Sequence, residues 1–103
     1  MYKFKVGVDL TRISRFENKN IFFINRILSK EEIKEFEKLN NEKEKSIFLA
    51  RSWAIKEAIF KSDNKYFEFN KINLYKRNKR WHFKNFKISI SYEDDYIVAF
   101  VVG

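Results

Sequence analysis

The stretch SWAIKEAIFK, residues 52–61, decides the fold, because it has the composition of a buried helix yet contains a carboxylate near its centre. That carboxylate is Glu57, whose neighbours three and four positions away on a helix are three apolar groups and Lys61. A carboxylate among apolar groups is unfavourable unless a positive charge lies beside it. Two interpretations follow: an ordinary ion pair with Lys61, or a carboxylate that binds a cation.

The sequence around this stretch predicts a long helix over 42–62, with a ridge of small side chains that would let another element approach closely. The ridge residues are spaced at i, i+4 and are Ala50, Ala54 and Ala58. A second helix is expected over 29–39, because Ser29 followed by Glu32 is a capping-box pattern. Residues 11–17 suggest a short additional helix.

Segments near the two ends of the chain predict strands. Residues 2–8 alternate, and their apolar side chains form the face expected to be buried: Tyr2, Phe4, Val6 and Val8. Further strands are expected at 67–76, 80–84 and 86–91. Residues 96–102 are almost all apolar, which is typical of a strand buried on both faces. This order predicts an α+β fold, in which an antiparallel sheet from both chain ends packs around the long helix.

Length and composition restrict the class of protein. A chain of 103 residues predicts one domain over 1–103. The absence of cysteine excludes disulfides and thiolate chemistry, and the single histidine, His82, excludes catalysis by paired histidines. No apolar run approaches the roughly 20 residues of a membrane span, and the N-terminus lacks a signal-peptide core. We therefore expect a cytoplasmic protein without a membrane partner. Its net charge of +8 favours an anionic partner or substrate.

Asp9 is the second carboxylate of interest, because it follows Gly7 on the same face of the first predicted strand. Gly7 would leave open space beside the Asp9 carboxylate. An alternative role for Asp9 is to cap the following helix. Two carboxylates from different elements suit Mg²⁺, which takes one or two carboxylates and completes its coordination with water and substrate phosphates. The sequence therefore predicts a magnesium site at Asp9 and Glu57, with Lys61 near the phosphates.

At these residues the chain resembles the 4′-phosphopantetheinyl transferase superfamily, in particular its small type, the holo-[acyl-carrier-protein] synthases. The stretches VGVDL (6–10) and WAIKEAIFK (53–61) resemble the two signature motifs of the superfamily. Three further stretches resemble the small type: residues 9–16, NRILSKEEIKEF (25–36) and SISYEDDYIVAFVV (89–102). The resemblance extends over nearly the whole chain, with the order and spacing of the motifs intact.

The resemblance implies a transferase that moves the 4′-phosphopantetheine group of coenzyme A to a serine of apo-acyl carrier protein, an acidic partner, and releases adenosine 3′,5′-bisphosphate. This places the chain in fatty acid biosynthesis. It also implies Mg²⁺, or alternatively Mn²⁺, and a homotrimer with active sites between subunits.

By position in the motifs, the resemblance assigns roles to individual residues. Asp9 and Glu57 would bind the metal, and Glu57 and Lys61 would be catalytic, with the serine proton taken either by Glu57 or by a metal-bound water. The residues expected to contact coenzyme A are Lys56, Lys61, Arg51 and Ser89. The residues expected to contact the carrier protein are Arg15 and Arg26.

The chain departs from the family pattern at three places. Lys61 is followed by SDNKYFEF (62–69) instead of a glycine-containing loop. In addition, Tyr92 replaces a histidine, and Ser52 replaces an arginine, although Arg51 is adjacent.

Two alternative functions remain open from the sequence. Aromatic and basic residues alternate over 73–87, a pattern that suits a module binding single-stranded nucleic acid. An ordinary strand pair with a solvated basic face explains the same pattern, and a nucleic-acid module leaves Asp9 and Glu57 unexplained, so no nucleic-acid partner is expected. The other alternative is a non-catalytic relative that keeps only the fold.

Overall fold

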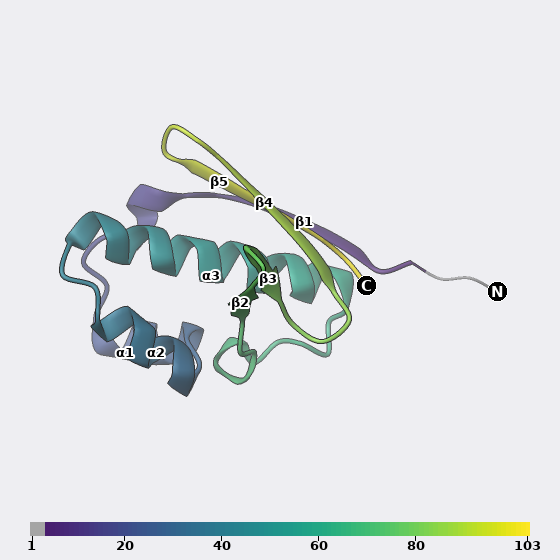
Figure 1. Cartoon of the computed structure of the whole chain (residues 1–103), viewed down its shortest axis with the longest axis horizontal. Coiled ribbons are helices and arrows are strands. Elements are labelled where there is room, and N and C mark those ends of the chain that lie inside the picture. The colour runs from purple at the N-terminus through teal and green to yellow at the C-terminus, as the bar shows by residue number, and fades with distance from the viewer. Residues whose placement is uncertain (1–3) are drawn as a thin grey trace.

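The long helix α3, Glu42–Ser62, is the centre of the molecule, and a three-stranded antiparallel sheet lies against it. The computed structural model describes residues 4–103. The sheet has the order β1-β5-β4, with β1 at Val6–Arg12, β4 at Lys87–Glu93 and β5 at Tyr96–Val102. Figure 1 shows α3 running between this sheet and the two shorter helices. The expected α+β fold, with a sheet built from both ends of the chain, is confirmed.

The remaining elements surround α3. Helix α1 spans Ile21–Ile27, helix α2 spans Lys30–Glu37, and single 3₁₀ turns lie at Ile13–Phe16 (η1) and Phe69–Lys71 (η2). The strands β2, Tyr75–Arg77, and β3, Arg80–His82, form a separate hairpin. Among residues 4–103, no helix is both long enough and apolar enough to cross a membrane.

The helices α2 and α3 both begin at a residue whose side chain caps the helix. Ser29 and Glu32 form the complete capping box of α2, since each side chain accepts a hydrogen bond from the backbone N–H of the other. Asn41 caps α3 by accepting a hydrogen bond from the N–H of Glu44 at 3.0 Å. Helix α1 is not among the sequence predictions, because its seven residues are too few to show a clear period.

Gly7 lets β1 approach the backbone of α3, and this differs from the role expected for it. A Cβ atom at Gly7 would lie 1.8 Å from the carbonyl oxygen of Ala58. The space beside Gly7 is therefore filled by the helix and is not open to a substrate. Ala58 belongs to the predicted ridge, whose three alanines are fully buried. The glycine of β1 therefore packs on a helix face that consists of small residues.

The apolar face of β1 points away from the core, contrary to the sequence prediction. The register pairs Gly7 with Val101 and Asp9 with Ala99, and these residues form the inner face against α3. The opposite, outer face of the sheet exposes large apolar side chains: Phe4, Val6, Val8, Leu10 and Phe100. Strand β5 is consequently buried on one face only, because among the described residues no helix covers the outer face of the sheet. Tyr2 lies outside the described residues.

The other strand boundaries also differ in detail. The strand expected at 67–76 is reduced to β2, and the residues before it contain the 3₁₀ turn η2. Residues 11–17 form the end of β1 and the turn η1 in place of an α-helix. The turn of the β2–β3 hairpin consists of Asn78 and Lys79, both with positive φ, as two-residue hairpin turns of type I′ require.

Candidate active site

Asp9 and Lys61, which are 52 residues apart in the sequence, meet where β1 crosses the last turns of α3. The Lys61 ammonium donates hydrogen bonds to Asp9 Oδ1 and to the carbonyl oxygen of Val8, both at 3.1 Å. The Asp9 side chain is only 11 % exposed, whereas the Lys61 side chain is 49 % exposed. Asp9 is thus largely buried, and Lys61 reaches it from the solvent side. We call the place where Asp9, Lys61 and the neighbouring Glu57 lie together the recess.

One carboxylate oxygen of Asp9 has no partner. Asp9 Oδ2 is buried and accepts no hydrogen bond from any residue between 4 and 103. A buried carboxylate oxygen without a hydrogen bond is unfavourable by about 1–3 kcal/mol or more, so such atoms are rare in native structures. Among the described residues this atom is the buried side-chain acceptor best placed to bind a ligand.

Glu57 lies close enough to Asp9 for the two charges to interact. Partial burial raises the pKa of Glu57 above its ordinary value, and the negative charge of Asp9 raises it further. The positive charges of Lys61 and Arg15 oppose this increase. Glu57 is therefore not an ordinary exposed partner of Lys61, since Lys61 bonds Asp9 instead. Asp9 on β1 and Glu57 on α3 therefore lie near each other, although they belong to different elements.

The pair suits a hard divalent cation. Asp9 Oδ2 is a free acceptor, and a cation between the two carboxylates would relieve their mutual repulsion. Among residues 4–103 no group of three or more His, Cys, Asp or Glu side chains gathers in one place. A metal ion here would thus have two protein carboxylates, as is common for Mg²⁺ bound together with a phosphorylated ligand.

Arg15 lies on the same side of the molecule, beside the 3₁₀ turn that follows β1. Its guanidinium donates a hydrogen bond to Thr11 Oγ1 at 3.2 Å and covers the ring of Trp53 at 5.7 Å from the ring centroid. Arg15 and Glu57 interact electrostatically, so this arginine lies at the edge of the recess. Arg26 is exposed at the last turn of α1.

The surroundings of Lys56 do not fit the phosphate contact that the sequence predicts for it. Its side chain is fully buried, and its ammonium forms an ion pair with Glu32 at 2.6 Å. The same nitrogen donates to two backbone carbonyl oxygens, those of Ile27 at 2.7 Å and Phe69 at 2.9 Å. Lys56 and Glu57 are consecutive and therefore point in directions about 100° apart around the helix, so only Glu57 turns toward Asp9.

Arg51 and Ser89 lie on surfaces separate from the recess. The Arg51 guanidinium covers the rings of Trp81 and Phe48, at 4.6 and 5.1 Å from the two centroids. Ser89 is on the outer face of β4, opposite Phe100 of β5. In one copy of the chain, then, these two expected coenzyme A contacts do not join Asp9, Glu57 and Lys61.

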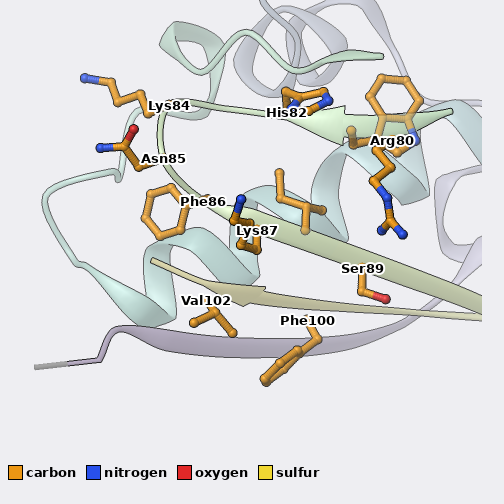
Figure 2. Close-up of a pocket in the computed structure, with 11 residues that line it drawn as sticks. Arg80, His82, Lys84, Asn85, Phe86, Lys87, Ser89, Phe100 and Val102 are labelled. Atoms are coloured by element: carbon orange, nitrogen blue, oxygen red, sulfur yellow. The ribbon is translucent and has the colours of Figure 1, made fainter. Parts of the chain in front are cut away.

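Ser89 lines a basic pocket of about 740 Å³ between the β2–β3 hairpin and the sheet. Figure 2 shows Arg80 extending from β3 toward Ser89, with Lys87 on β4 and Phe100 on β5 at the same pocket. Lys84 lines its other end. Sequence reasoning assigned Ser89 to coenzyme A, whereas it considered Arg80, Lys84 and Lys87 only as part of the basic and aromatic stretch 73–87.

Comparison with known proteins adds to this geometry. Residues 5–101 match the family model of the 4′-phosphopantetheinyl transferase superfamily. A holo-[acyl-carrier-protein] synthase of Mycoplasma mobile is 58 % identical over 103 residues, covering 99 % of this chain and 92 % of the relative.

Two solved structures have a similar fold. The crystal structure of a Plasmodium yoelii holo-ACP synthase has a TM-score of 0.84 at 27 % identity, covering 95 % of this chain and 91 % of the other. A Bacillus anthracis holo-(acyl-carrier-protein) synthase, solved in complex with CoA (3′,5′-ADP), has a TM-score of 0.80 at 25 % identity, covering 95 % and 93 % of the two chains.

Proposed function

The chain belongs to the 4′-phosphopantetheinyl transferase superfamily, and on this premise we propose that it acts as a holo-[acyl-carrier-protein] synthase. In this reaction the serine hydroxyl oxygen of apo-acyl carrier protein attacks the phosphorus atom next to the pantetheine of coenzyme A. The phosphoanhydride bond breaks, adenosine 3′,5′-bisphosphate leaves and the serine proton is released. The single observation that supports this function best is the unpartnered Asp9 Oδ2 beside Glu57 and Lys61.

Asp9 and Glu57 would hold the divalent cation, Mg²⁺ or alternatively Mn²⁺. When bound, the cation supplies positive charge that neutralises the pyrophosphate of coenzyme A. The raised pKa of Glu57 fits this role, since the carboxylate gains most from a positive charge where burial and a like charge disfavour its ionised form. Glu57 is also a candidate acceptor of the serine proton, for which a raised pKa is favourable.

Lys61 would neutralise charge on the transferred and leaving groups. Its ammonium is half exposed and already reaches the recess, so it can contact a pyrophosphate oxygen while it remains near Asp9. An ammonium at this position can also donate a proton to the leaving phosphate oxygen. Phosphoryl transfer depends chiefly on such electrostatic positioning, which these three side chains provide from two rigid elements.

A homotrimer with active sites between subunits would explain two features of the single chain. The outer face of the sheet exposes contiguous large apolar side chains, which in monomeric proteins is unusual and typical of an interface. The basic pocket at Ser89 is suited to the phosphates of coenzyme A, yet Ser89 lies on the outer face of the sheet, while Asp9 lies on the inner one. A neighbouring subunit would bring the pocket of one chain to the recess of another.

The carrier protein would bind beside the recess, at Arg15 and Arg26. Both side chains are exposed and positively charged, and Arg15 interacts with Glu57, so a carrier held there would present its serine near the proposed metal site. We further propose that the chain works as one domain over 1–103 in the cytoplasm, in fatty acid biosynthesis.

The direct test is incubation with apo-acyl carrier protein, coenzyme A and Mg²⁺, followed by intact mass measurement of the carrier. We expect the mass to increase by one phosphopantetheine group, and the increase to depend on the metal. An Asp9→Asn variant is the matched control, since it keeps the shape of the side chain. Unchanged carrier mass with folded protein and a cognate carrier would refute the proposal. Stabilisation by polynucleotide, without stabilisation by coenzyme A and Mg²⁺, would favour the nucleic-acid alternative.

A further inference from the structure

Lys56 is the only lysine among the described residues that is fully buried, and its surroundings define its protonation state. Its Nζ lies within 2.6–2.9 Å of three acceptors, namely Glu32 Oε1 and the carbonyl oxygens of Ile27 and Phe69. A neutral amine has two hydrogens to donate, whereas an ammonium has three. The three acceptors therefore match a charged ammonium whose hydrogens are all used, which leaves none for a phosphate.

Glu32 extends this contact into a network. Its Oε1 also accepts a hydrogen bond from the N–H of Ser29, and its Oε2 accepts one from the N–H of Leu74 at 2.7 Å. We call Lys56, Glu32, Ile27 and Phe69 the Lys56 network. It fastens the end of α1, the start of α2, the turn η2 and the segment before β2 to one turn of α3.

The two carbonyl oxygens in this network belong to residues that line a pocket of about 300 Å³ on the surface. The pocket lies between α1, α3 and η2, and the residues that line it are Phe23, Arg26, Ile27, Trp53, Phe67 and Phe69. Trp53 connects two of these elements, since its ring stacks on Phe23 and meets the edge of Phe69 at centroid distances of 6.4 and 5.6 Å. Lys56, one turn after Trp53, binds the backbones of the pocket's two flanking elements, α1 and η2.

Stability alone is a poor explanation for this arrangement. A buried ion pair rarely stabilises a fold more than apolar side chains of similar size, because both charges must be removed from water. An apolar side chain cannot, however, donate hydrogen bonds to two carbonyl groups from different elements. What Lys56 contributes is a fixed relative placement of Ile27 and Phe69, the residues on either side of the pocket that includes Arg26.

We infer that Lys56 is a positioning residue for carrier-protein binding, which acts by holding α1 and η2 in place on α3. The inference rests on the proposed transfer to a carrier protein and on the location of Arg26 beside the pocket. Lys56 contacts neither the carrier nor coenzyme A. Replacing Lys56 should therefore raise the carrier KM and leave the coenzyme A KM nearly unchanged.

The test uses Lys56→Met and the double variant Lys56→Met/Glu32→Gln in the full chain, with Lys34→Met as the control that removes one exposed lysine charge. Lys56→Met alone leaves Glu32 buried without its cation, so its Tm should fall markedly. The double variant removes both charges and should recover most of that Tm. We still expect its carrier KM to be raised about tenfold, with the coenzyme A KM within about twofold of wild type.

Three outcomes would overturn the inference in active wild-type protein. A double variant with recovered Tm and a normal carrier KM would show that Lys56 matters for stability alone. A raised coenzyme A KM with a normal carrier KM would show that Lys56 serves the nucleotide. A raised carrier KM in Lys34→Met would assign the effect to net charge.

Where the double variant does not fold, Lys56→Gln replaces it, and a parallel rise of both KM values in Lys56→Gln would refute the inference. Wild-type protein without transfer would instead refute the proposed function.

Discussion

At the scale of single residues, the main feature of the recess is a buried carboxylate oxygen without a hydrogen-bond partner. Asp9 shares one oxygen with Lys61 and has no partner for the other, and Glu57 is partly buried beside it. Proteins seldom retain a buried, unpartnered carboxylate oxygen that contributes only to stability. The burial of these two carboxylates is therefore costly, and a bound cation would offset that cost.

Asp9→Asn and Glu57→Gln should each reduce kcat by at least about 100-fold, because each removes a negative charge that holds the cation. Neither variant should lower the free energy of unfolding appreciably, since Asn or Gln relieves the repulsion between two carboxylates. Steady-state kinetics and thermal unfolding with and without Mg²⁺ measure both effects. Near-wild-type turnover at limiting Mg²⁺ in both variants would show that the metal is not bound here.

Asp9, Glu57 and Lys61, which the sequence motifs group together, also lie together in the structure, whereas Lys56 lies apart from them, and the difference has a physical cause. The first three belong together because two motifs bring acidic and basic residues to one crossing of strand and helix. The environment of Lys56 depends on acceptors at Ile27, Glu32 and Phe69, which are 29, 24 and 13 residues away. No local pattern reports such contacts, so a buried lysine and a phosphate-binding lysine look alike in the sequence.

At the scale of elements, the packing of β1 on α3 sets the geometry of the recess. Gly7 lies against the Ala58 carbonyl, and Asp9, two residues later on the same face of the strand, is thereby brought to the turn of α3 that carries Glu57. The spacing of strand and helix thus helps to set the separation of the two proposed metal ligands. Any change that separates the elements should affect fold and activity together.

Gly7→Ala should destabilise the protein by about 3 kcal/mol or more, because the new Cβ would meet backbone atoms that cannot rotate away. Chemical denaturation measures the loss in free energy of unfolding. Ala58→Gly is an informative partner, since it leaves the Ala58 carbonyl in place and should not rescue Gly7→Ala. Unchanged stability of Gly7→Ala would mean that β1 and α3 are farther apart than described.

The element boundaries show where sequence patterns suffice. Helix α3 was predicted with its observed bounds because a long, largely apolar segment with an i, i+4 ridge of alanines favours a helix. The orientation of β1 was predicted wrongly because alternation identifies an apolar face but not what covers it. In this chain the apolar row faces outward, and the inner face is built from Gly7, Asp9 and Thr11, which allow the strand to pack closely on α3.

At the scale of the whole molecule, charge and the outer face of the sheet indicate two kinds of association. The apolar row of β1 continues across Phe100 on β5, giving a surface suited to another copy of the chain. The net charge of +8 suits an acidic partner such as a carrier protein. The two surfaces are chemically distinct, so self-association and carrier binding can be separated by mutation.

The wild-type protein should sediment as a homotrimer, with three times the 12.6 kDa mass of one chain. Leu10→Glu places a charge at an outer-face position that is 63 % exposed in one copy, and it should yield monomers without loss of the fold. Analytical ultracentrifugation and circular dichroism check these outcomes. A wild-type monomer at assay concentration, or a Leu10→Glu trimer, would contradict the proposed interface.

Arg15→Glu and Arg26→Glu should raise the carrier KM and weaken its dependence on ionic strength, while the coenzyme A KM changes little. Electrostatic steering raises association rates by roughly 10-fold or more at low salt, so reversing a charge in the docking surface should be visible there first. Kinetics with one substrate varied at a time measure the difference. Arg77→Glu, on the exposed hairpin, is the matched charge control. Equal effects of all three variants would indicate that docking is not localised.

The pairing of β1 with β5 has a consequence for synthesis of the protein on the ribosome. Val6 pairs with Val102, and Arg12 pairs with Tyr96, so the first strand acquires its only described strand neighbour after more than 80 further residues have been translated. Such long-range pairing slows folding and leaves hydrophobic surface exposed in the meantime. The nascent chain can form α3 early, but Val6, Val8 and Leu10 must await β5. We therefore expect the emerging polypeptide to depend on chaperones that shield its first strand until translation is nearly finished.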